Sequence, residues 1–137
     1  MKPAIWDVHC HFPRNFENPD NQDHGKALDE RADALRESGV VKASLLSGGR
    51  FGLTYEEGLE WGKRHPELWV PSAVVDPEEL GYRDIKRLFE QGYKGLKMIG
   101  VRSAYDDYKY FPVYAAAEEL VGLAVDVDAL HAQGVDL

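Results

Sequence analysis

Ile5-Trp6-Asp7-Val8-His9-Cys10-His11 is the stretch of sequence on which the fold prediction depends. Its apolar start predicts a β-strand, and Pro13 ends that strand because proline has no N–H group to donate to a neighbouring strand. Side chains two residues apart on a strand lie on the same face. We therefore expect Asp7, His9 and His11 to share one face near the carboxyl end of the strand.

Apolar segments alternate with amphipathic segments along the rest of the chain. Thr54 and Glu57 have the spacing of a capping box at the start of a helix, and Gly39 and Gly92 are suited to end helices. Five strands alternating with four helices predict an α/β fold with a parallel sheet and right-handed crossovers. The expected strands are 5–11, 40–46, 68–75, 93–99 and 123–127, and the expected helices are about 27–37, 54–65, 84–91 and a segment that begins at Pro112.

Two architectures fit this count of elements. A five-stranded doubly wound sheet would be complete in 137 residues, whereas a (β/α)₈ barrel needs about 250. A central strand of a doubly wound sheet is buried on both faces and is usually an unbroken apolar run. Because residues 5–11 carry three ionisable groups near a strand end, we expect the rim of a TIM barrel instead. The chain would then be a single domain, 1–137, holding about the first five strands and four helices of a truncated barrel.

Composition limits the classes of partner. The chain is 44% hydrophobic and 29% charged, as in an ordinary globular protein. Its net charge is -8, with 24 acidic against 16 basic residues, which argues against nucleic acid as a partner. The chain has one cysteine, Cys10, and therefore no internal disulfide. We see no signal peptide and no apolar run of about 18 residues, so we expect a cytoplasmic protein without a membrane partner.

His9 and His11 are the strongest chemical signal in the sequence. Two imidazoles on the same side of a strand suit a divalent metal, zinc above all, and would supply half of a tetrahedral ligand set. Asp7 is expected one pleat deeper, where its carboxylate would orient a ligating histidine from the second shell of the site. The competing interpretation is that two histidines alternate at a strand end by chance, because the His-x-His pattern alone is common.

The chain resembles the amidohydrolase superfamily, in particular its amidohydrolase-related branch. The segment from Ile5 to Phe12 is similar to the opening strand of that family. The likeness covers most of residues 4–124. It also includes Arg64–Pro77 around the third strand, Gly92–Met98 at the fourth strand and Phe111–Leu120 in the helix that follows.

This resemblance implies a metal-dependent hydrolase with a (β/α)₈ barrel. His9 and His11 would bind the metal, and a metal-activated water would attack a small cyclic ester or amide-like substrate. A non-oxidative decarboxylase on the same scaffold is one alternative. Others are a non-catalytic truncated half-barrel that binds a partner and a flavodoxin-like binding module. The family also has a fifth-strand histidine that Leu123–Asp128 lacks; Asp126, Asp128 or His131 is the candidate for that place.

Three further residues are candidates for the site. Lys97 lies near the end of the fourth strand. The resemblance implies that in some members of the superfamily a lysine there bridges two metals. The alternative is that Lys97 lies at the rim and contacts solvent. Arg50 and Arg102 follow the second and fourth strands and are candidates for binding an acidic substrate group, each weighed against a solvated surface role. Unpaired edge strands in a half-barrel predict self-association or a complementary half-barrel as partner.

Overall fold

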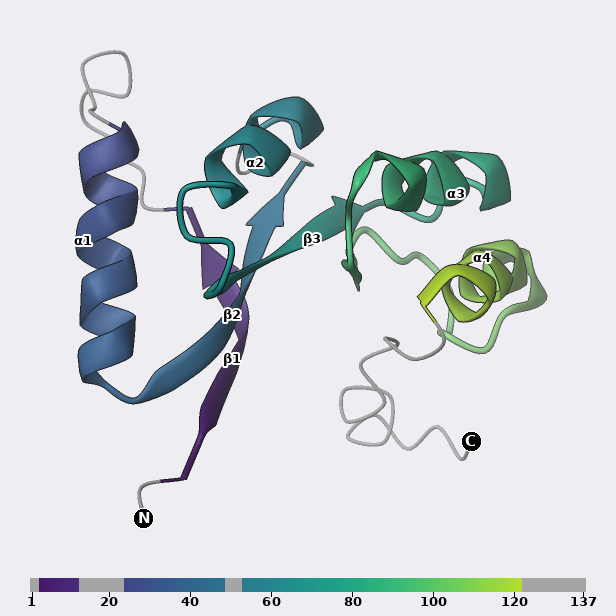
Figure 1. Cartoon of the computed structure of the whole chain (residues 1–137). Coiled ribbons are helices and arrows are strands. Elements are labelled where there is room, and N and C mark those ends of the chain that lie inside the picture. The colour runs from purple at the N-terminus through teal and green to yellow at the C-terminus, as the bar shows by residue number, and fades with distance from the viewer. Residues whose placement is uncertain (1–2, 13–23, 49–52, 122–137) are drawn as a thin grey trace. The chain divides into compact units, whose positions relative to one another are not determined.

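The computed structural model of this chain describes residues 3–12, 24–48 and 53–121 (Figure 1). The described elements mix helices and strands, as expected. The four strands form one sheet in the order β1-β2-β3-β4, and the pairs β1–β2 and β3–β4 are parallel. The fifth strand expected at 123–127 lies outside the described residues. In chain order the elements are β1 Ile5–His11, α1 His24–Glu37, β2 Val40–Ser47, α2 Tyr55–Gly62, β3 Trp69–Val75, α3 Tyr82–Gln91, β4 Gly95–Met98, the 3-10 helix η2 Tyr108–Tyr110 and α4 Phe111–Val121.

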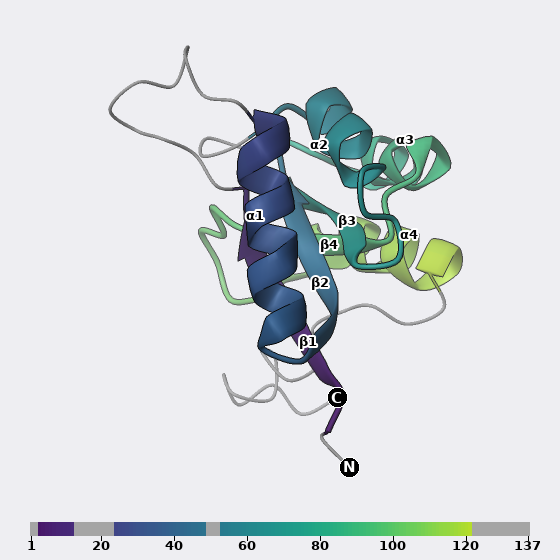
Figure 2. The same ribbon diagram turned by 60° about the vertical axis from the view of Figure 1, so that its left-hand side comes forward.

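The chain divides into two compact units, Met1–Pro71 and Ser72–Leu137. In the first unit, α1 runs alongside β1 and β2 (Figures 1 and 2). Leu28 of α1 and Leu45 of β2 are fully buried in the core of this unit. Burying each such side chain contributes about 1.5–3 kcal/mol to stability. The core cluster comprises Cys10, Phe12, Leu28, Ala32, Val40, Ala43, Leu45, Leu53, Leu68 and Trp69, with Leu35 and Trp61 packed against it.

The capping box at the start of α2 is confirmed. Thr54 Oγ1 accepts a hydrogen bond from the Glu57 N–H at 3.2 Å, and Glu57 Oε2 accepts one from the Thr54 N–H at 2.8 Å. The two side chains therefore satisfy two backbone groups that the helix itself leaves without partners. Because both bonds are local, the sequence pattern alone was enough to predict where this helix begins.

In the second unit, the end of β3 pairs with β4 from Ser72–Gly95 to Val75–Met98. The helices α3 and α4 pack against each other. Gly92 ends α3 with φ of 125°, a conformation that favours glycine. The strand β4 is shorter than the expected 93–99, because the Tyr93 N–H still bonds to the carbonyl of Leu88 at 3.1 Å and completes the last turn of α3.

Across the three described ranges, no helix is both long enough and apolar enough to cross a membrane.

Candidate functional site

The carboxyl end of β1 brings two imidazole rings together. His9 Nε2 and His11 Nε2 lie 2.8 Å apart, and the ring centroids are 4.8 Å apart with an interplanar angle of 54°. Both residues are exposed. At this separation one Nε2–H donates to the Nε2 of the other ring, so the two nitrogens point at the same small region next to solvent.

The strand β1 contains a β-bulge next to the histidine pair. Asp7 pairs with Ala43 and Cys10 with Leu45, so three steps along β1 match two steps along β2. A bulge places one extra residue on a strand and breaks the two-residue alternation locally. The bulge falls on residues 8–9 and so includes His9, the first of the two histidines.

Asp7 does not share the face of the two histidines, and that prediction is wrong. Its ladder partner Ala43 belongs to the core cluster, as do Cys10 and Leu45, so Asp7 lies on the core-facing side of β1. Its carboxylate Oδ1 accepts a hydrogen bond from the backbone N–H of His9 at 2.9 Å. The carboxylate therefore supports the bulged backbone of His9.

Two converging nitrogens fit part of a zinc site. With Zn–N bonds of 2.0–2.1 Å, tetrahedral geometry separates two ligand nitrogens by about 3.3 Å. The pair would have to open by about 0.5 Å to hold such an ion. Among residues 3–12, 24–48 and 53–121, no group of three or more His, Cys, Asp or Glu side chains could hold a metal ion. A metal bound by His9 and His11 would therefore need further donors from outside the described residues.

Cys10 lies between the two histidines in the sequence, and its thiol is neutral. Burial raises the pKa of its thiol, and the negative charge of Asp7 raises it further. The Sγ–H group points toward the carbonyl oxygen of His11 at 3.8 Å. Since a thiolate is the form that binds metals, Cys10 is poorly suited to be a ligand here.

The other candidate residues lie away from β1 in the sequence. Lys97 lies on β4 opposite Val74, and burial lowers the pKa of its ammonium group. Arg102 follows β4 in the second unit and its side chain is exposed. Arg50 lies outside the described residues, as do the fifth-strand candidates Asp126, Asp128 and His131.

A buried tyrosine fixes the loop that carries Arg102, and the sequence did not predict it. The hydroxyl of Tyr110 accepts hydrogen bonds from the backbone N–H groups of Arg102 at 3.0 Å and Ser103 at 3.1 Å, and it donates to Glu78 Oε1. Glu78 also binds Lys109 Nζ at 2.8 Å. Lys109 and Tyr110 together lower the pKa of Glu78 to about 2, so Glu78 remains a carboxylate. The backbone of Arg102 is thus held in place, while the residue itself is exposed.

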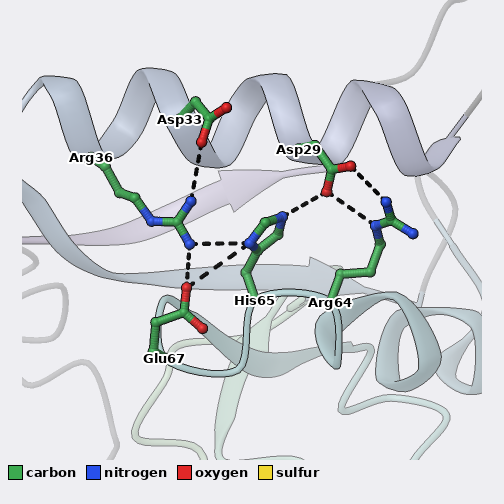
Figure 3. Close-up of polar contacts among 6 residues, drawn as sticks. All are labelled: Asp29, Asp33, Arg36, Arg64, His65 and Glu67. Atoms are coloured by element: carbon green, nitrogen blue, oxygen red, sulfur yellow. Dashed lines mark hydrogen bonds and ion pairs between the residues drawn. The ribbon is translucent and has the colours of Figure 1, made fainter.

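His65 belongs to a polar network in the first unit (Figure 3). Its Nε2 lies 2.7 Å from Asp29 Oδ1, and its Nδ1 lies 3.0 Å from an amino group of Arg36. Arg64 donates two further hydrogen bonds to Asp29, at 3.1 and 2.6 Å. These contacts join α1 to the connection between α2 and β3, which gives His65 a structural role.

Comparison of the chain with models of known protein families, with curated proteins and with solved structures finds no match. A function for this chain therefore has to be inferred from the arrangement of its side chains on the α/β sheet.

Proposed function

We propose that this chain contributes the first-strand ligands of a metal-dependent hydrolase of the amidohydrolase-related type. The observation that supports the proposal best is the 2.8 Å approach of His9 Nε2 and His11 Nε2 at the exposed carboxyl end of a parallel strand. Catalytic groups of (β/α)₈ barrels gather at that end of the strands. In this proposal β1 to β4 are the first strands of such a barrel.

The chemistry follows from the residue types. Neutral imidazoles are good ligands for zinc, and a zinc ion bound there would lower the pKa of a water molecule toward neutrality. The substrate in this proposal is a small cyclic ester or amide. Arg50 and Arg102 would bind an acidic group of the substrate. Lys97, whose ammonium pKa is lowered by burial, is the candidate for a catalytic group on β4.

Zinc titration of the whole chain by calorimetry tests the ligand assignment. We expect His9→Ala and His11→Ala each to lower zinc affinity by about tenfold or more, the effect of losing a direct ligand. His65→Gln is the matched control: it also removes one histidine, but from the network in Figure 3, and should leave zinc affinity unchanged. Equal zinc affinity in all four proteins would mean that His9 and His11 are ordinary strand histidines.

The exposed apolar side chains of β1 support the proposed partner, a second copy or a complementary half-barrel. Trp6 is 69% exposed and Val8 67%, on the first strand of the sheet order. Edge strands with exposed apolar groups readily pair with other chains. We expect residues 1–137 to self-associate in sedimentation and to hydrolyse esters and lactones slowly with added zinc. A stable monomer with turnover of about 1 per second would contradict both expectations.

A further inference from the structure

The histidine pair lies on the outer strand of the sheet in the first unit. In the strand order β1-β2-β3-β4, β1 is the first strand, and its neighbour among the described strands is β2. His9 and His11 are both exposed, and so are the large apolar side chains of Trp6 and Val8 on the same strand. The imidazoles therefore lie on a surface of the first unit that a second protein chain can reach.

One copy of the chain provides half of a tetrahedral ligand set at this place. The two Nε2 atoms lie 2.8 Å apart, so a single ion can contact both once the pair opens slightly. Within residues 3–12, 24–48 and 53–121 of one copy, no third histidine, cysteine or carboxylate joins them in a group that could hold a metal. A second copy carries the same two nitrogens on the same exposed strand. Two copies together therefore supply the four donors that tetrahedral zinc takes.

Charge and proton balance favour a divalent cation between the copies. Each chain has a net charge of -8, so two copies repel each other, and a bound dication offsets part of that repulsion. Binding through both Nε2 atoms requires that the ring which donates the 2.8 Å hydrogen bond carry its proton on Nδ1 instead. This change of tautomer releases no proton and leaves both imidazoles neutral, the form in which histidine binds metals.

We propose that one zinc ion joins two copies of this chain through His9 and His11 of each copy. The inference rests on the zinc ligands assigned under the proposed function and adds the second copy as their partner. A two-fold axis through the ion relates the two histidine pairs, as in other interfaces that use one surface twice. Four imidazoles fill the coordination shell, so no position is left for the water that a hydrolase activates. The bridged dimer is therefore a closed, resting form of the site.

The test measures self-association of residues 1–137 by sedimentation equilibrium in zinc chloride and in EDTA, with bound zinc counted by calorimetry. We expect one zinc ion per two chains. With free zinc at about ten times the dissociation constant of the bridging site, self-association should be about tenfold tighter than in EDTA. His9→Ala and His11→Ala should each remove this difference, and both residues are exposed, so neither substitution disturbs the core. His65→Gln removes a histidine from the network in Figure 3 and should keep the full effect.

The outcomes separate the bridge from the proposed hydrolase function. One zinc ion per chain, lost in His9→Ala and without tighter self-association, would overturn the bridge and keep the ligand assignment, with the other donors supplied by the same chain. Tighter association in zinc that persists in both alanine variants would overturn the bridge as well. One zinc ion per two chains, dependent on His9 and His11, supports the bridge even if the chain hydrolyses no ester or lactone. Zinc binding that needs neither histidine would remove the bridge and the ligand assignment together.

Discussion

Replacing Tyr110 by phenylalanine removes a single hydroxyl group that has three partners. Tyr110 is fully buried, and its ring remains in the variant, so core packing is retained. The lost contacts are the hydrogen bonds from the Arg102 and Ser103 N–H groups, at 3.0 and 3.1 Å, and the bond donated to Glu78. The substitution therefore tests how the loop after β4 is held, separately from how the core is filled.

The expected loss follows from what each partner retains. The Arg102 N–H keeps a second acceptor, Glu78 Oε1 at 3.2 Å, and Glu78 keeps its ion pair with Lys109. The Ser103 N–H loses the Tyr110 hydroxyl. Leaving one such donor without its acceptor costs about 1–3 kcal/mol. The pKa of Glu78 should also rise from about 2, because Tyr110 is one of the two side chains that lower it.

Native-state amide exchange measures this loss at each residue. At 1.4 kcal/mol per factor of ten, protection of the Ser103 amide should fall about 5- to 150-fold, and protection of Arg102 should fall less. Tyr108→Phe removes a hydroxyl from a side chain that is 82% exposed and should leave both amides unchanged. If Arg102 loses as much protection as Ser103, or if neither amide changes, the tyrosine does not hold the loop in the way described.

Two further predictions concern pH and backbone conformation. Hydrogen bonds from Arg64 and then His65 lower the pKa of Asp29 to about 2 from its usual 3.8. A depressed folded-state pKa contributes stability that is complete above about pH 4 and is lost as pH falls through about 2, so urea midpoints of Asp29→Asn should vary less over this range than wild type. Equal variation would contradict the pairing. Gly100→Ala should lower stability by about 1–3 kcal/mol in thermal melts, because Gly100 has φ of 75° and a Cβ there would lie 2.6 Å from the Asp76 carboxylate. Gly81→Ala is the control, since a Cβ at Gly81 would meet nothing within 4 Å; similar losses in both variants would refute the steric argument.

The sequence predicted the described elements well wherever local signals decide them. The capping box at Thr54 and the glycine at the end of α3 depend on neighbouring residues alone, and both were found. Tyr93 was placed wrongly in a strand because hydropathy does not distinguish a buried strand residue from one that closes a helix. The contact that separates the two cases is its N–H bond to the Leu88 carbonyl.

The candidate site was predictable only in part. The two-residue spacing correctly predicted that the side chains of His9 and His11 lie together. It placed Asp7 on the wrong face, because no pattern in the sequence predicts the bulge at residues 8–9. The hydrogen bonds of the Tyr110 hydroxyl were not predicted, for another reason. Its partners, Glu78 and the backbone of Arg102, lie 32 and 8 residues away, and such contacts leave no periodic pattern in a sequence.

The bulge in β1 has a consequence for protein design. Two hydrogen bonds at the histidine pair, from the His9 N–H to Asp7 and between the two imidazoles, lie within residues 7–11. Five consecutive residues that carry two such local contacts can be tested as a portable module. Grafted onto the end of an edge strand in an unrelated parallel sheet that has room for one extra strand residue, they should present the same two nitrogens, and the host would supply the remaining donors of a chosen metal.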